Sequence, residues 1–176
     1  MTENEQTIES LEDELAESRA ETRAAFANRA NLYAYLFEEL VSVLGKDEAI
    51  AAMKRAIYRR GLEVGRKYQP AVEAGDMIEV GRIFCEGSPS GGALFHPGIE
   101  ESEDGHLVLH MTSCPLVEAW QEMGLPADEI DTLCDIAAAV DEGTFEGAGL
   151  DLTFLSRIGV VGTDKCLLDL QLPADE

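Results

Sequence analysis

Apolar residues recur at helical spacing through the first part of the chain. Between residues 22 and 66 they return every three or four positions, a pattern typical of helices that bury one face. Two helices are predicted here, with Gly45 ending the first and Asp47 capping the second. Pro70 interrupts the pattern, and a shorter helix is predicted over residues 71–84.

The pattern changes to alternation from about residue 99. Asp104-Gly105 is a strong signal for the turn of a β-hairpin. Pro115 is expected to begin a helix, because proline fits the first helical position. A further helix stripe follows over residues 130–140, and two strands are expected to pair antiparallel at its far end, over residues 150–158 and 165–172.

Helices that come first and antiparallel strands that come later are typical of an α+β fold. We therefore expect N-terminal helices packed on a small, mainly antiparallel β-sheet, with two further helices. Residues 21–176 would form this single domain. Residues 1–20 are strongly acidic with few apolar anchors, which predicts an acidic tail or a frayed helix.

The formal net charge of −22 on 176 residues narrows the classes of partner. Nucleic acids and anionic membranes are disfavoured, because binding to phosphates needs clustered Lys and Arg. No apolar stretch approaches a spanning helix, and the acidic, polar start differs from a secretory signal, so a cytoplasmic protein is expected. A small-molecule substrate is the expected partner, and a homo-oligomer is compatible with the sequence. A salt-adapted source and a well-solvated mesophilic surface explain the acidity equally well.

Four cysteines are the first candidates for chemistry, and none forms a CxxC pair. Cys114 would lie at the N-cap of the helix that begins at Pro115, where the helix dipole favours a thiolate, a nucleophile and metal ligand. The alternative is a small buried residue that fits before a proline. Cys134 and Cys166 fall at inward-facing positions, where packing as small hydrophobic residues is the default.

Charged candidates accompany the cysteines. Asp141 lies seven residues after Cys134 and returns to the same helix face, although it could instead cap a turn at the helix end. Arg59 and Arg66 belong to the basic cluster on the second helix, which is either a solvated face or an anion site. Gly61 and Gly65 lie one turn apart on that helix, which would let another backbone or a ligand come close.

A set of short motifs follows in a characteristic order through most of the chain. It comprises Cys114-Pro115 with Trp120, then Leu133-Cys134-Asp135, then Asp141 with Gly143, and finally Gly162 with Cys166. With the helices before it, this order resembles the L-2-amino-thiazoline-4-carboxylic acid hydrolase family over about residues 22–172. The resemblance implies ring opening of a cyclic thiazoline amidine to a carbamoyl-cysteine. It also implies that packing alone does not account for the three cysteines.

The favoured hypothesis is therefore a hydrolase that cleaves a C–N bond in a small, non-peptide cyclic amidine. Cys114 would attack as a thiolate, or would ligate a metal whose bound water attacks, and Asp141 or Glu118 would transfer protons. Arg59 or Arg66 would hold the substrate carboxylate, with Trp120 as a further substrate-binding candidate.

Two alternatives stand beside this hypothesis. The pattern is also similar to small-ligand-binding modules of the 4-vinyl reductase type. There a structural zinc ion would be held by cysteines, here Cys114, Cys134 and Cys166. In the other alternative the chain is a scaffold whose cysteines only pack in the core.

Overall fold

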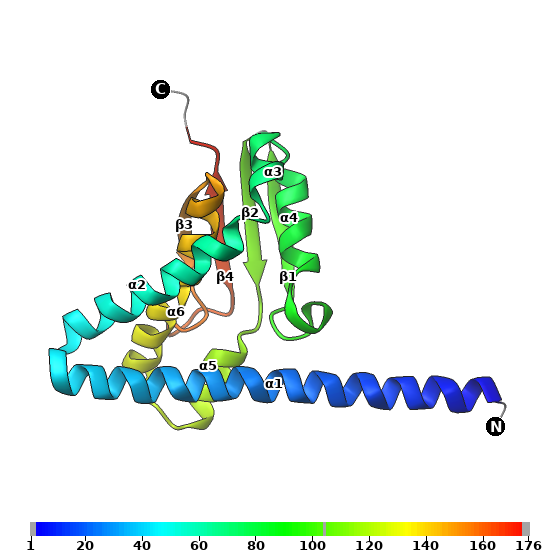
Figure 1. Ribbon diagram of the computed structural model, residues 1–176, viewed down its shortest axis with the longest axis horizontal. Helices are drawn as coiled ribbons and strands as arrows, with labels where there is room; N and C mark the ends of the chain where they lie inside the picture. The colour runs from blue at the N-terminus through cyan, green and yellow to red at the C-terminus, as the bar shows by residue number, and fades with distance from the viewer. Residues whose placement is uncertain (1–2, 104, 174–176) are drawn as a thin grey trace.

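The computed structural model describes residues 3–103 and 105–173 (Figure 1). The helices are α1 Glu3–Leu44, α2 Lys46–Gly65, α3 Gln69–Glu73, α4 Met77–Glu86, the short 3-10 helix η1 Pro89–Gly92, α5 Pro115–Glu122 and α6 Ala127–Ala148. The strands are β1 Pro97–Glu103, β2 His106–Met111, β3 Asp151–Ser156 and β4 Cys166–Gln171. None of the helices in this part of the chain is long and apolar enough to cross a membrane.

The four strands form one sheet in the order β1-β2-β4-β3, and every neighbouring pair is antiparallel. β1 and β2 form the predicted hairpin, in which Glu103 pairs with His106, while Asp104 lies outside the described residues. β3 and β4 form the second predicted pair. The predicted fold, α+β with helices on a small antiparallel sheet, is confirmed.

The two long N-terminal helices meet at Gly45, as predicted. Gly45 has a φ of 84°, a conformation that favours glycine, and it separates α1 from α2. The predicted capping role of Asp47 is wrong, because Gly45 itself is the N-cap and Asp47 lies in the first turn. A carboxylate is still favourable there, beside the positive end of the helix dipole.

The single helix predicted over residues 71–84 is two helices. Gly75, with a φ of 69°, ends the turn after α3. Asp76 then caps α4, and its carboxylate accepts a 2.9 Å hydrogen bond from the backbone N–H of Glu79. The glycine and the capping carboxylate together explain why the chain breaks here.

Helix α6 is longer than predicted. The turn that Asp141 would have capped, one of the two alternatives from the sequence, is absent because α6 continues through Ala148. Glycines in its last two turns serve packing, since a Cβ on Gly143 would collide with the carbonyl oxygen of Tyr58 on α2. A Cβ on Gly61 would lie 2.8 Å from the Cα of Gly143. The expectation that Gly61 lets another backbone approach is confirmed, and that backbone belongs to α6.

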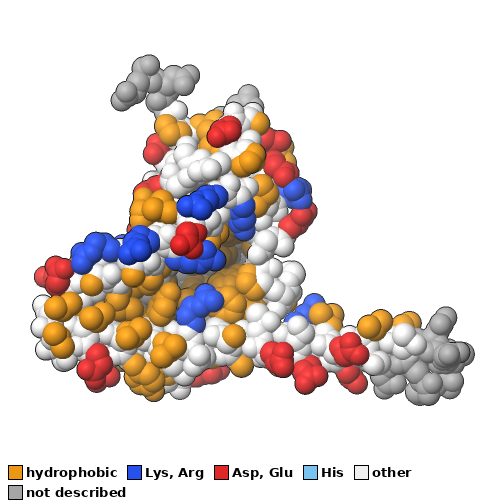
Figure 2. Space-filling model, viewed as in Figure 1, with side chains coloured by type: hydrophobic (Ala, Val, Ile, Leu, Met, Phe, Trp, Pro, Cys, Tyr) orange, Lys and Arg blue, Asp and Glu red, His pale blue; other side chains and the backbone are white. Residues whose placement is uncertain are grey.

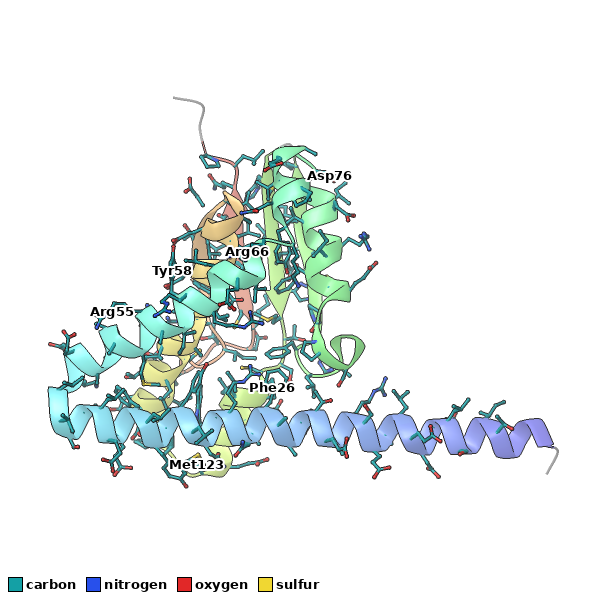
Figure 3. The ribbon with its side chains drawn as sticks, viewed as in Figure 1. Phe26, Arg55, Tyr58, Arg66, Asp76 and Met123 are labelled. Atoms are coloured by element: carbon teal, nitrogen blue, oxygen red, sulfur yellow. The ribbon has the colours of Figure 1, made fainter. Side chains whose placement is uncertain are left out.

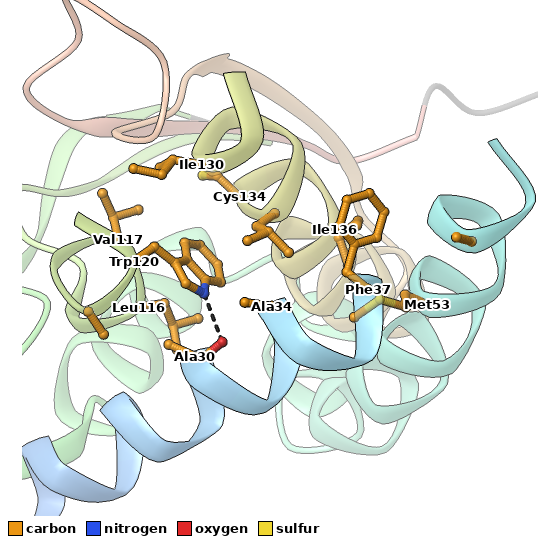
Figure 4. Close-up of a cluster of buried hydrophobic side chains, with 13 residues drawn as sticks. Ala30, Ala34, Phe37, Met53, Leu116, Val117, Trp120, Ile130, Cys134 and Ile136 are labelled. Atoms are coloured by element: carbon orange, nitrogen blue, oxygen red, sulfur yellow. Dashed lines mark hydrogen bonds between the residues drawn. The ribbon is translucent and has the colours of Figure 1, made fainter. Parts of the chain in front are cut away.

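The core has two parts. In the first, α1, α2, α5 and α6 enclose the wholly buried Trp120, whose indole N–H donates a 2.8 Å hydrogen bond to the carbonyl oxygen of Ala30 (Figure 4). In the second, α3, α4 and the end of α6 cover the sheet, with Phe145 and Leu168 among the buried side chains. Ile158 packs against both parts, so the segment after β3 lies at the junction between them.

Candidate functional site

A cavity of about 230 Å³ lies where the two parts of the core meet. Its wall comes from distant segments: Phe26 on α1, Tyr68 before α3, Cys114 before α5, Asp141 on α6 and Cys166 on β4. Figure 2 shows a hollow above α1 with a hydrophobic floor and Lys and Arg side chains near it. The volume is below the ~300–1,000 Å³ that is usual for drug-sized ligands, which suits a small ligand.

The cavity brings together four residues singled out by the sequence. Cys114, Cys134, Cys166 and Asp141 all line it, although Cys114 and Cys166 are 52 residues apart. Two surface grooves, which are more open than the cavity, contain none of these four residues. The four cysteines of the chain are all free thiols, and Cys85 lies in one of the open grooves.

Backbone N–H groups approach the thiols. Cys114 is the N-cap of α5, as predicted, with Pro115 as the first helical residue. Cys166 opens β4, and its sulfur accepts a 3.3 Å hydrogen bond from the backbone N–H of Ile158. Gly159 lies against Cys134, since a Cβ on Gly159 would be 2.8 Å from that sulfur. The segment after β3 therefore closes over both Cys134 and Cys166.

Burial dominates the acidity of these thiols. It raises the pKa of Cys114 to about 12 and that of Cys166 to about 11, and it also raises the pKa of Cys134. The N–H groups of Val117 and Leu116 act in the opposite direction on Cys114, but neither forms a capping hydrogen bond with the sulfur. The predicted lowering of the Cys114 pKa is therefore wrong, because burial outweighs the helix N-terminus.

Asp141 is the carboxyl group that lines the cavity. Burial, followed by the nearby charge of Glu142, raises the pKa of its carboxyl to about 7. The side chain can be reached from the cavity, yet protein surrounds it on its other sides. Its charge also contributes to raising the pKa values of Tyr68 and Cys166, so both lie close to it. A carboxyl that is half-protonated near neutral pH can both donate and accept protons.

Replacement of Asp141 by asparagine is expected to change how stability depends on pH. A carboxyl whose pKa is raised on folding stabilises the folded state at low pH, and that stability is lost as pH rises through about 7. Between pH 5 and pH 8, the free energy of unfolding of Asp141→Asn should rise by about 3 kcal/mol relative to that of the wild type, at ~1.4 kcal/mol per pKa unit. Urea unfolding across this range, above the isoelectric point of about 4.3, measures the difference. A difference that stays constant with pH would contradict the buried carboxyl.

Three cations line the cavity, and they differ in their partners. Arg157 is held by Asp135 and, at 3.3 Å, by Asp131, so its charge is already balanced. Lys67 and Arg29 make no ion pair within residues 3–103 and 105–173. The Lys67 ammonium lies 4.9 Å from the centre of the Tyr68 ring, and the Arg29 guanidinium lies 4.5 Å from that of Phe26. Lys67 and Arg29 are therefore available to an anionic ligand.

The remaining candidates from the sequence lie elsewhere. Glu118 accepts a 2.8 Å hydrogen bond from the Ser113 hydroxyl and pairs with Arg23, outside the cavity lining. Arg59 lies in the open groove on α2, and Arg66 is exposed and does not line the cavity. Trp120 is buried in the core without reaching the cavity. The fold thus brings together the cysteines and Asp141, but not the two predicted arginines, Glu118 or Trp120.

The cavity lining contains side chains of the types that bind metal ions. Three thiols and a carboxylate converge on the cavity, which is a set that suits zinc by chemical type. In the part of the chain that the structure describes, however, no three His, Cys, Asp or Glu side chains are arranged to hold a metal ion. The assignment of Cys114, Cys134 and Cys166 as ligands of zinc stays a prediction.

The sequence is similar to that of a known protein family. The family model described as L-2-amino-thiazoline-4-carboxylic acid hydrolase matches residues 25–167. No curated protein matches the sequence.

Solved structures resemble the fold at low sequence identity. The phenol-responsive sensory domain of the transcription activator PoxR, solved with phenol, has a TM-score of 0.51 and 13% identity, with 84% of this chain and 74% of that chain covered. A trafficking protein particle complex subunit 3 from Naegleria fowleri, covalently bound to palmitic acid, has a TM-score of 0.48 and 12% identity, with 82% and 95% covered. At such identities the PoxR domain supports the fold alone.

Proposed function

Because the chain belongs to the L-2-amino-thiazoline-4-carboxylic acid hydrolase family, we propose that its cavity is the active site of a hydrolase that opens a small cyclic amidine. One observation carries the proposal: the thiol of Cys114 and the carboxyl of Asp141, with a pKa of about 7, line the same cavity. A nucleophile and a group that transfers protons near neutral pH are what amidine hydrolysis requires.

The proposed chemistry uses both residues. The Cys114 sulfur adds to the amidine carbon, and its proton passes through Asp141 to the ring nitrogen. The bond between that carbon and the ring nitrogen then breaks, and the nitrogen leaves as an amine with a second proton drawn from the exocyclic amino group. Water adds to the same carbon and expels the Cys114 sulfur, which recovers a proton, so the product is a carbamoyl group. A thiol with a raised pKa needs such proton removal, because little thiolate is present at neutral pH.

The substrate carboxylate would lie at Lys67 and Arg29, in place of the Arg59 and Arg66 suggested by the sequence. These two cations line the cavity and make no ion pair in the described part of the chain. A guanidinium can bind a carboxylate through two parallel hydrogen bonds, and a lysine ammonium adds a compact charge. The phenylalanines that line the cavity would enclose the ring of the substrate.

A binding module without catalysis is the second candidate. Four phenylalanines line the cavity, which favours an apolar or aromatic ligand: Phe26, Phe84, Phe95 and Phe154. In this case Cys114 stays protonated, as its raised pKa favours, and no bond is broken. A module of this kind would bind its ligand and release it unchanged.

Turnover of L-2-amino-thiazoline-4-carboxylate by the purified protein separates the two candidates. The hydrolase should convert it to carbamoyl-cysteine, detected by NMR or mass spectrometry. Lys67→Ala and Arg29→Ala should each raise KM by about tenfold with a smaller change in kcat, since ~1.4 kcal/mol of lost binding is one factor of ten. Arg59→Ala, in the open groove, serves as the matched control. Binding of the compound without any product would support the module instead.

A further inference from the structure

The N-terminal part of α1 forms an arm that leaves the body of the protein. Figure 1 shows α1 extending past α5 and far beyond the sheet on its N-terminal side. Every side chain from Ser10 to Glu21 is exposed. An isolated helix of about this length is marginally stable in water, and packing of an apolar face usually supplies the rest. The arm is defined as residues 3–21, and its segment from Ser10 to Glu21 therefore lacks the packing that stabilises the other long helices.

The arm has an apolar stripe. Ile8, Leu11 and Leu15 are spaced three and four residues apart, which places them on one side of the helix. All three are at least half exposed, at 57%, 58% and 50%. Charge surrounds this stripe, because residues 3–21 contain eight acidic residues and a single Arg. An apolar stripe in an acidic helix suits a groove that is apolar at its floor and basic at its edges.

Such a groove lies on α2. It is lined by Tyr58 and Leu62 together with the cations Lys54, Arg55 and Arg59, and by Glu142, whose charge is balanced by Lys54 at 3.3 Å. Residues 46–67 hold seven basic residues against three acidic ones, in a chain with a net charge of −22. Arg59 makes no ion pair in the described part of the chain, and Arg55 has only a 3.2 Å contact with Glu48 on the surface. The groove and the arm are thus complementary in both charge and apolar content.

One chain cannot make this contact with itself. α1 is a single helix, its arm points away from α2, and Arg55 and Tyr58 lie towards the opposite end of the molecule in Figure 3. We propose that the arm of one copy docks on the α2 groove of a second copy. Leu11 and Leu15 pack on Tyr58 and Leu62, and the arm carboxylates face the arginines. Two copies related by a two-fold axis exchange arms, so the contact forms twice and closes a dimer.

Two acidic arms would repel each other if they paired directly. Like charges along adjacent helices are unfavourable, whereas acidic and basic helices attract at a range of about 10 Å at 0.1 M salt. This difference selects the basic groove on α2 over the arm of the partner as the docking surface. It also predicts that the dimer weakens as salt concentration rises.

Sedimentation velocity on the full chain tests the proposal. The wild type is expected to be a dimer at micromolar concentration in low salt. Arg55→Glu combined with Arg59→Glu should raise the dimer dissociation constant at least about tenfold, and so should Glu12→Lys combined with Glu14→Lys. Combining both pairs of substitutions should restore the dimer, which a loss of folding could not do. Val161→Asp, at an 80% exposed apolar position between β3 and β4, is the control and should leave the dimer unchanged.

Other results of the sedimentation experiment would contradict the proposed contact. A monomeric wild type at low salt would overturn the proposal. A dimer that survives both charge reversals, or one that is lost on reversal of the arm but survives reversal of the α2 arginines, would place the contact elsewhere than α2. Absence of rescue in the combined variant would show that the two charged surfaces do not meet.

Discussion

Replacement of Cys114 by serine is expected to lower kcat/KM for the thiazoline substrate by at least about a thousandfold while the protein remains folded. Serine retains a capping oxygen before Pro115, so α5 should begin as before. The hydroxyl is a far weaker nucleophile than the thiol and would not form the proposed intermediate. Steady-state kinetics combined with urea unfolding separates loss of chemistry from loss of fold.

Cys85→Ser provides the matched control for this substitution. Cys85 also has a raised pKa but lines an open groove and not the cavity, so its replacement should leave turnover unchanged. Full activity in Cys114→Ser would remove Cys114 from the mechanism. Unfolding of that variant would instead show that the sulfur is needed for packing or for holding a metal ion.

Replacement of Gly143 by valine is expected to destabilise the protein by more than about 4 kcal/mol, which is enough to unfold many domains. A Cβ at this position meets the backbone of Tyr58 and would lie 3.1 Å from the Cα of Gly61. Backbone atoms cannot turn aside as a side chain can, so α2 and α6 would have to separate. The free energy of unfolding from urea titration measures the effect.

Gly147→Ala is the graded control for the helix contact. A Cβ at Gly147 would lie 3.0 Å from the flexible Leu62 side chain, which can move aside, and 3.2 Å from the Leu62 Cα, whereas at Gly143 it would collide with the Tyr58 carbonyl oxygen. Alanine also favours the helix by about 1 kcal/mol over glycine, so the net change should be small. Equal losses in the free energy of unfolding for Gly143→Val and Gly147→Ala would contradict close backbone packing at Gly143.

The helices, the hairpin and the final strand pair were predictable because each rests on local signals. Gly45 and Pro115 act on their own neighbours, and Asp104-Gly105 lies between two alternating segments. Helix α6 was predicted too short for the opposite reason. Gly143 and Gly147 are typical of a turn when only their neighbours are considered, and their packing role depends on α2, about 80 residues earlier.

The same difference between local sequence signals and distant packing explains which residues of the candidate site were predicted. Cys114, Cys134, Cys166 and Asp141 were singled out by spacing and family resemblance, and they line one cavity. Lys67 and Arg29 were missed, because nothing in their local sequence distinguishes them from other surface cations. Their place at the cavity depends on how α1 packs on α5 and how α2 packs on α6. The acidity of Cys114 was misjudged because the N-cap is visible in the sequence and the burial of the thiol is not.

The most direct measurement of the central claim is a crystal structure of Cys114→Ser with the thiazoline substrate bound. The account predicts the ring in the cavity between residue 114 and Asp141, with its carboxylate at Lys67 and Arg29. Substrate bound in the open groove at Tyr58, Arg59 and Leu62, with the cavity unchanged, would contradict it.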